Sequence, residues 1–190
     1  MSLDAPQGHI GFTLNGAEIT VPAEPTVCLS ELLREVAGAR DVKVGCNAGD
    51  CGACTVLVDG DPVCACMMAA GQVQGRTVET QAGLVADDPL AERLTQSFQR
   101  HQAAQCGICT PGMMVSAVAL LRSGEALTEE SVSDALGGVL CRCTGYRKII
   151  AAVLDASDTA PLAEGGVGAP IARLDGWPKV SGTERFGDDV

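Results

Sequence analysis

Ten cysteines are the residues of this 190-residue sequence with the clearest capacity for chemistry. Cys46, Cys51 and Cys54 are spaced C-x4-C-x2-C, and Cys66 follows further along in a strand-like segment. This spacing is a ligand pattern of [2Fe-2S] clusters, whose four cysteine thiolates must converge. Glycines interspersed in the loop permit positive φ angles and let backbone N–H groups approach the sulfur atoms. We therefore expect a cluster site around residues 45–54.

Spacing alone leaves the fourth ligand and the metal open. Cys64 lies two residues before Cys66, on the same face of the segment if that segment is a regular strand, so either could be the fourth ligand. Four cysteines also bind zinc, but zinc loops usually pair their ligands in C-x2-4-C knuckles, which disfavours zinc here. Cys28, and Cys64 if it is not a ligand, are expected to be small buried apolar residues.

A second set of cysteines combines the spacings C-x2-C and C-x-C. Its members are Cys106, Cys109, Cys141 and Cys143. Each pair precedes a segment with helical periodicity, and a helix N-terminus favours the negative charge of thiolates. This spacing fits zinc as well as iron–sulfur ligation, and its association with the first set favours iron–sulfur. We therefore expect two four-cysteine sites.

Composition and charge exclude several other classes of function. Thirteen Lys and Arg against 24 Asp and Glu give a net charge of −11, which opposes binding to phosphate backbones, so no nucleic-acid partner is expected. The longest apolar stretches fall well short of the roughly 20 residues that span a bilayer, so no membrane span is expected. The N-terminal residues show neither a basic nor an apolar export region, which predicts a cytoplasmic protein with reduced cysteines.

Strand and turn signals dominate residues 8–86. Alternating apolar residues flank Asn15-Gly16, which predicts a β-hairpin. Residues 29–36 have the periodicity of a short amphipathic helix, and residues 55–58 are predicted as a strand that leads into a second hairpin. A small mixed sheet with one helix packed across it would position the first cysteine loop.

Helical periodicity replaces the strand signals over residues 87–158. Four helix starts are predicted from N-cap residues and early prolines, at Asp88-Pro89, Thr110-Pro111, Thr128 and Thr144. Four helices form a small bundle with the second cysteine set at their N-terminal ends. Over residues 159–190 glycine, alanine and proline become frequent and no periodicity remains, so we expect a tail that runs extended over its own surface or a partner's.

Three motifs stand in order along the chain: GCNAGDCGACTV from Gly45, QCGICTPGM from Gln105 and CRCTGY from Cys141. Together they resemble the iron–sulfur subunit of the xanthine oxidase family of molybdenum hydroxylases, and the resemblance covers about residues 8–156. It implies an α+β protein. An N-terminal β-grasp domain of the plant-type ferredoxin kind would precede a C-terminal four-helix domain, each with one [2Fe-2S] cluster.

The resemblance also implies the site residues. The family has a cysteine followed by small apolar residues at the fourth position of the first site, which favours Cys66 over Cys64. The implied ligands of the first cluster are Cys46, Cys51, Cys54 and Cys66. Those of the second cluster are Cys106, Cys109, Cys141 and Cys143. Gln105 and the backbone around Cys143 are implied to contact molybdopterin held by a larger partner.

The function implied by the resemblance is electron transfer within a molybdenum hydroxylase. Electrons would pass from molybdopterin to the helical-domain cluster, then to the plant-type cluster, and outward to FAD or an external acceptor. The implied partners are a molybdenum-binding large subunit and an FAD-binding medium subunit, in a hetero-oligomer for which the family expectation is a dimer of heterotrimers. The segment from Ile171 to Asp188 resembles the opening of the molybdenum-binding portion, and its apolar side chains predict docking on a partner.

The predicted organisation has three parts: a ferredoxin-like domain over residues 8–86, a helical domain over 87–158 and a tail over 159–190. Two other functions compete with the one implied by the resemblance. A free-standing two-cluster ferredoxin would be stable as an isolated chain with both clusters reducible. A zinc-stabilised adaptor without a redox role would be colourless.

Overall fold

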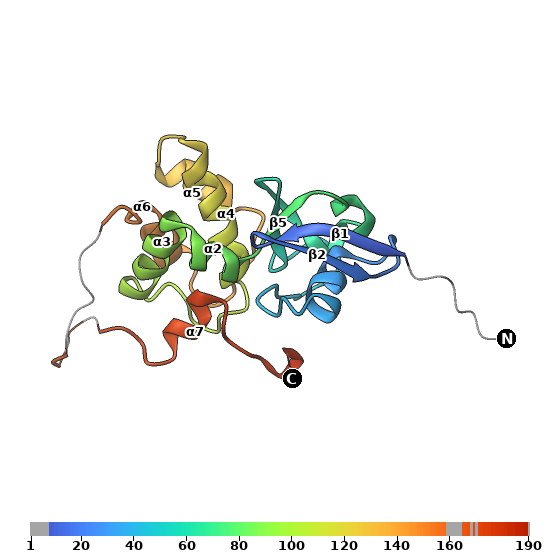
Figure 1. Ribbon diagram of the computed structural model, residues 1–190. Helices are drawn as coiled ribbons and strands as arrows, with labels where there is room; N and C mark the ends of the chain where they lie inside the picture. The colour runs from blue at the N-terminus through green and yellow to red at the C-terminus, as the bar shows by residue number, and fades with distance from the viewer. Residues whose placement is uncertain (1–7, 159–164, 168, 170, 190) are drawn as a thin grey trace.

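The computed structural model describes residues 8–158, 165–167, 169 and 171–189. A five-stranded sheet lies beside a group of helices, and the C-terminal segment runs below both in the view of Figure 1. The strand order is β2-β1-β5-β3-β4, with β1 and β5 parallel and the other neighbouring pairs antiparallel. The strands are β1 (His9–Leu14), β2 (Ala17–Pro22), β3 (Thr55–Val58), β4 (Asp61–Cys64) and β5 (Thr77–Glu79).

Both predicted hairpins are present, and each has a two-residue turn. Asn15 and Gly16 have φ angles of 49° and 79°, and Asp59 and Gly60 have φ angles of 52° and 92°. Positive φ at both central residues is the geometry that matches the right-handed twist of two antiparallel strands. Local turn chemistry therefore sets the register of both pairs.

The predicted helix over residues 29–36 forms in two parts. A first turn, α1 (Leu29–Glu31), continues as a π-helix, η1 (Leu32–Val36). The three leucines of this segment are fully buried in the core of the sheet domain. After β4 the chain forms a 3-10 turn, η2 (Ala65–Met67), so Cys66 lies in a turn and not in the strand-like segment predicted.

The four predicted helices are all present, with one further helix, α2, in front of them. Asp88 caps α3 through its carboxylate, which accepts a hydrogen bond from the N–H of Leu90 at 2.7 Å. Thr128 caps α5 by accepting from the N–H of Ser131 at 3.1 Å. The N-cap of α4 is Cys109, one residue before the predicted Thr110. These helices are α2 (Gln81–Asp87), α3 (Pro89–Arg100), α4 (Thr110–Ser123), α5 (Glu129–Leu136) and α6 (Arg147–Leu154). No helix in the ranges described above is long and apolar enough to cross a membrane.

Strand β3 belongs to both hydrophobic cores. All four of its residues are buried, because successive side chains point to opposite faces and both faces are covered. Val56 and Val58 pack in the core of the sheet domain, whereas Leu57 packs in the core of the helical domain. The two domains therefore meet along this strand and α4.

The C-terminal segment was expected to run extended, but it contains a short helix, α7 (Gly176–Ser181), and a final 3-10 turn, η4 (Gly187–Asp189). Val180 is 1% exposed in the helical core, and its carbonyl oxygen accepts a hydrogen bond from Nε2 of Gln81 at 2.9 Å. Trp177, on the same short helix, is 52% exposed. The segment therefore packs on its own chain while leaving some apolar surface open.

Candidate functional site

The first cysteine set lies in the loop between η1 and β3, with one member in η2. The Sγ atom of Cys46 accepts hydrogen bonds from the N–H groups of Ala48 and Cys51, both at 3.3 Å, and its thiol interacts with that of Cys51. These backbone N–H groups, Ala48 first, stabilise the thiolate and lower the pKa of Cys46 to about 7. The loop thus favours an anionic sulfur before any metal is bound.

Cys54 and Cys66 form a second, buried pair in the same site. The N–H of Cys66 donates to Sγ of Cys54 at 3.4 Å, and the two thiols interact. Burial raises the pKa of Cys54 to about 12. The nearby charge of Cys64 raises the pKa of Cys54 less than that of Cys66 does. This geometry supports Cys66 over Cys64 as the partner of Cys54.

The second set is formed by two cysteines of the loop before α4 and two of the loop after α5. Cys109 is buried at the N-cap of α4, and its thiol interacts with that of Cys141. Burial is the main cause that raises the pKa of Cys109, and the nearby charge of Cys141 adds to it. Burial also opposes ionisation of Cys141, but hydrogen bonds that include the Thr144 hydroxyl at 3.1 Å outweigh it and lower the pKa of Cys141.

Cys106 and Cys143 complete the second set at the protein surface. Both residues are exposed, and their side chains interact with each other. The hydrogen bond with the Cys106 side chain is the largest cause that raises the pKa of Cys143. Gln105, predicted to contact a partner's cofactor, is also exposed and directly precedes Cys106. The second site therefore has one pair made of a buried and a half-buried thiol, and one pair open to a partner.

Tyr146 also belongs to this site, although cysteine spacing does not point to it. Its hydroxyl accepts a hydrogen bond from the N–H of Cys141 at 2.9 Å and donates to the carbonyl oxygen of Val139 at 3.3 Å. Tyr146 has a φ of 66°, which places its backbone in the left-handed region just before α6. Its position in the CRCTGY motif is the sequence signal that could have found it.

The eight thiols of the two cysteine sets are arranged as four pairs, two in each set. A [2Fe-2S] cluster has two irons, each of which takes two cysteine ligands, so two pairs suit one cluster. A tetrahedral zinc site instead needs its ligands to surround one ion. The residues present therefore fit [2Fe-2S] clusters better than zinc.

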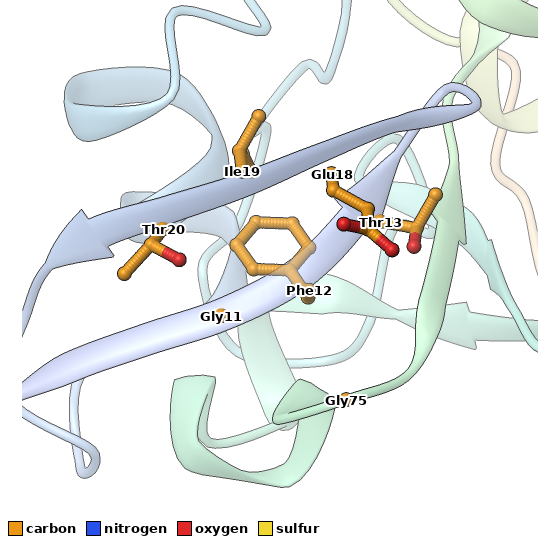
Figure 2. Close-up of a pocket in the computed structure, with 7 residues that line it drawn as sticks. All are labelled: Gly11, Phe12, Thr13, Glu18, Ile19, Thr20 and Gly75. Carbon is orange, nitrogen blue, oxygen red and sulfur yellow. The ribbon is translucent and has the colours of Figure 1, made fainter.

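A surface hollow on the sheet domain lies apart from the thiols. It has a volume of about 210 Å³ and is formed mainly by β1 and β2, as Figure 2 shows. Its lining residues are Gly11, Phe12, Thr13, Glu18, Ile19, Thr20 and Gly75. None of them is a cysteine, and Glu18 is the one ionisable side chain among them. The groups capable of redox chemistry therefore lie in the cysteine loops and not around this hollow.

Comparison with family models identifies both halves of the chain. Residues 12–93 match a 2Fe-2S iron-sulfur cluster binding domain, and residues 80–154 match a [2Fe-2S] binding domain. The solved aldehyde oxidoreductase from Desulfovibrio gigas is similar over 96% of this chain and 22% of its own, with a TM-score of 0.85 and 33% identity. This similarity confirms the predicted α+β fold with a ferredoxin-like domain followed by a helical one.

Two curated relatives extend the comparison to whole subunits. The chain is 49% identical over 144 residues to the small FeS subunit of nicotinate dehydrogenase from Eubacterium barkeri, covering 76% of this chain and 91% of the relative. It is 41% identical over 152 residues to the iron-sulfur-binding subunit of xanthine dehydrogenase from Escherichia coli O157:H7, covering 79% and 94%. With both domains and all three motifs in place, the chain belongs to the iron–sulfur subunits of the xanthine oxidase family, oxidoreductase subunits that transfer electrons through two [2Fe-2S]-binding domains.

Proposed function

We propose that eight cysteines of this chain bind two [2Fe-2S] clusters, one in each domain. The observation that carries the proposal is the pairing of the thiols. In the sheet domain the ligands are Cys46, Cys51, Cys54 and Cys66. In the helical domain they are Cys106, Cys109, Cys141 and Cys143. Each bound cluster supplies one-electron redox chemistry, and the chain's own residues hold, bury and orient it.

The proposed path begins at the exposed pair of the helical domain. Cys106 and Cys143, with Gln105 beside them, form the face that would meet molybdopterin on a large molybdenum-binding partner. Electrons would then cross to the sheet domain and leave past Cys46, which is half-buried, to FAD on a medium subunit or to an external acceptor. The exposure of one thiol pair in the helical domain supports it as the entrance.

The proposed assembly is a hetero-oligomer with a molybdenum-binding large subunit and an FAD-binding medium subunit, as a dimer of heterotrimers. Its support is that the nicotinate and xanthine dehydrogenase relatives are themselves named as subunits. We place it in the cytoplasm, because all ten cysteines are free and a reducing compartment keeps thiols available for iron.

Metal analysis and EPR test the ligand sets. The full chain should contain about four iron and four sulfide ions and give two distinct signals after reduction. Cys66→Ser should remove about half of the iron and one signal, whereas the matched variant Cys64→Ser should keep both. Zinc in place of iron, with no signal, would support a structural adaptor and reject the proposal.

Co-purification tests the assembly. When the chain is expressed with its native partners, it should elute with molybdenum and flavin in one complex. Replacing the exposed Gln105 by Glu should weaken that complex while leaving the iron content of the chain unchanged. If the chain carries both clusters but elutes alone under these conditions, it is instead a free-standing two-cluster ferredoxin.

A further inference from the structure

The two cysteine loops meet at a backbone contact between the domains. The N–H of Leu140 donates a hydrogen bond to the carbonyl oxygen of Cys51 at 2.9 Å. Cys51 belongs to the first cysteine set, and Leu140 directly precedes Cys141 of the second. One hydrogen bond and a short run of covalent bonds therefore join a thiol of one site to a thiol of the other.

Glycines make this close approach possible. A Cβ atom on Gly112, in α4, would collide with the carbonyl oxygen of Gly52 and lie 3.2 Å from Cγ1 of Val139. A Cβ atom on Gly52, whose φ is 66°, would collide with the carbonyl oxygen of Gly138. We call Gly52, Gly112 and the backbone of residues 138–140 the glycine seam. Backbone meets backbone in this seam because Gly52 and Gly112 carry no side chain.

Each side of the glycine seam is fixed by hydrogen bonds within its own domain. The carbonyl oxygen of Gly52 accepts from the N–H of Thr55 at 3.1 Å and from its hydroxyl at 2.7 Å. On the other side, Tyr146 binds the backbone of Val139 and Cys141. Val139 is 1% exposed within the seam, whereas Leu140 beside it is 56% exposed. The seam is thus a tightly held and partly buried connection between the two cysteine loops.

We propose that the glycine seam sets the rate of electron transfer between the two cluster sites, with the hydrogen bond from Leu140 to Cys51 as the connecting bridge. The proposal rests on the proposed function, because it requires a cluster at each cysteine set. One electron lost at one site is gained at the other, and no proton moves and no bond forms or breaks. Electron tunnelling falls off less steeply through bonds and hydrogen bonds than across open gaps, so a wider seam slows the transfer.

Gly112→Ala is the direct test, because helix propensity and steric contact predict opposite effects. Alanine is favoured over glycine inside a helix, so propensity alone predicts a more stable α4. The collision with Gly52 predicts a displaced seam instead. Gly138→Ala is the matched control, since a Cβ atom there meets nothing within 4 Å.

The measurement uses the full, cluster-loaded chain. Electron exchange between the clusters is followed after rapid partial reduction. The magnetic interaction of the two reduced clusters is measured by EPR, and the reduction potential of each cluster is determined by redox titration. Gly112→Ala should keep its iron and both potentials, but exchange should slow by roughly tenfold or more and the magnetic interaction should weaken. Gly138→Ala should match the wild type.

A second pair of variants removes the bridge itself. Leu140→Pro lacks the N–H donor, and Leu140→Ala keeps it while removing a side chain that is 56% exposed. Exchange should slow in the proline variant only. An unchanged rate of electron exchange and an unchanged magnetic interaction in Gly112→Ala or Leu140→Pro would overturn the proposal. Loss of iron in both variants would also overturn it, because the seam would then serve cluster assembly. A wild-type chain without two iron–sulfur signals would instead reject the proposed function.

Discussion

At the scale of single residues, the surroundings of the thiols give them different tendencies to ionise. Backbone N–H groups stabilise Cys46 as a thiolate, whereas burial opposes ionisation of Cys54 and Cys109. Tyr146 adds no thiol, but it ties together the loop that carries the second set. A residue of this kind acts by positioning a ligand.

Tyr146→Phe should lower the free energy of unfolding by about 1–2 kcal/mol, because the N–H of Cys141 and the carbonyl of Val139 both lose their partner. Denaturant unfolding of the full chain measures this loss. Ser123→Ala is the control, since its hydroxyl likewise donates to a carbonyl oxygen, that of Leu120, and accepts from an N–H, that of Glu125, but at the exposed end of α4. Equal effects of the two substitutions would show that the Tyr146 hydroxyl has no special structural role.

The spacing of the cysteines is visible in the sequence, whereas the contacts of Tyr146 are not, for one physical reason. Ligand spacing is a local property of the chain, so the C-x4-C-x2-C pattern is visible without the fold. The contacts of Tyr146 depend on a loop that turns back on itself through a left-handed residue. The resemblance favours Cys66 over Cys64 as the fourth ligand, but the alternating pattern did not indicate the turn η2, which brings the N–H of Cys66 to Cys54.

At the scale of elements, prediction succeeded where a few neighbouring residues decide the conformation. Asn15-Gly16 sets the first hairpin, and Thr128 caps α5 as predicted. The division of β3 between two cores was not predicted, because it depends on α4 covering one face of the strand. Leu57 therefore has a role that its sequence neighbours do not reveal.

Leu57→Ala should destabilise the whole chain by about 2–5 kcal/mol, because Leu57 is fully buried where the sheet meets the helical core. In a denaturant titration, the absorbance of both clusters should be lost in one transition at a lower midpoint. Leu127→Ala, at a residue that is 36% exposed, is the control and should shift the midpoint much less. An unchanged midpoint in Leu57→Ala would contradict the assignment of β3 to both cores.

At the scale of the whole molecule, the domains are joined on several sides. Arg122 of α4 makes a bidentate contact with the carboxylate of Glu79 on β5, with both N–O distances at 2.9 Å. Elsewhere, the end of the C-terminal segment brings the Asp189 carboxylate to Lys43 at 2.6 Å and to Arg34 at 3.0 Å. In Figure 1 this segment passes from α7 below the helices toward the sheet.

The surface on which the C-terminal segment packs could not be predicted from the sequence. Its apolar residues predicted docking, but a pattern within the segment does not identify the surface that it docks on. Arg34 and Lys43, the partners of Asp189, lie far away in the sequence. The structure places Val180 and Asp189 on the chain's own two domains, while Trp177 stays half-exposed. Docking on a partner through that remaining apolar surface stays a prediction.

Asp189→Asn should release the end of this segment at neutral pH. The Asp189 side chain is 1% exposed between two cations, and breaking such a buried pair costs roughly 3–5 kcal/mol. Trypsin should then cut after Lys179 and Arg185 at least tenfold faster than in the wild type, as mass spectrometry can measure. Asp188→Asn is the control, because Asp188 is exposed and only its backbone carbonyl contacts Arg34.

The same contact should depend on pH in a direction that the geometry fixes. Burial alone would raise the pKa of Asp189, but hydrogen bonds from Lys43, the N–H of Phe186 and Arg34 outweigh it and hold that pKa below its usual value. A carboxylate with a depressed folded-state pKa stabilises the fold fully above its unfolded pKa of about 3.9, and the stabilisation is lost as the pH falls through the folded value. Wild type and Asp189→Asn should therefore differ most in pepsin cleavage of the segment at pH 5, and the difference should shrink as the pH is lowered below the unfolded pKa. A difference that does not shrink as the pH falls would mean that the Asp189 charge is not what holds the segment, because a protonated Asp189 and an asparagine are alike in charge and size.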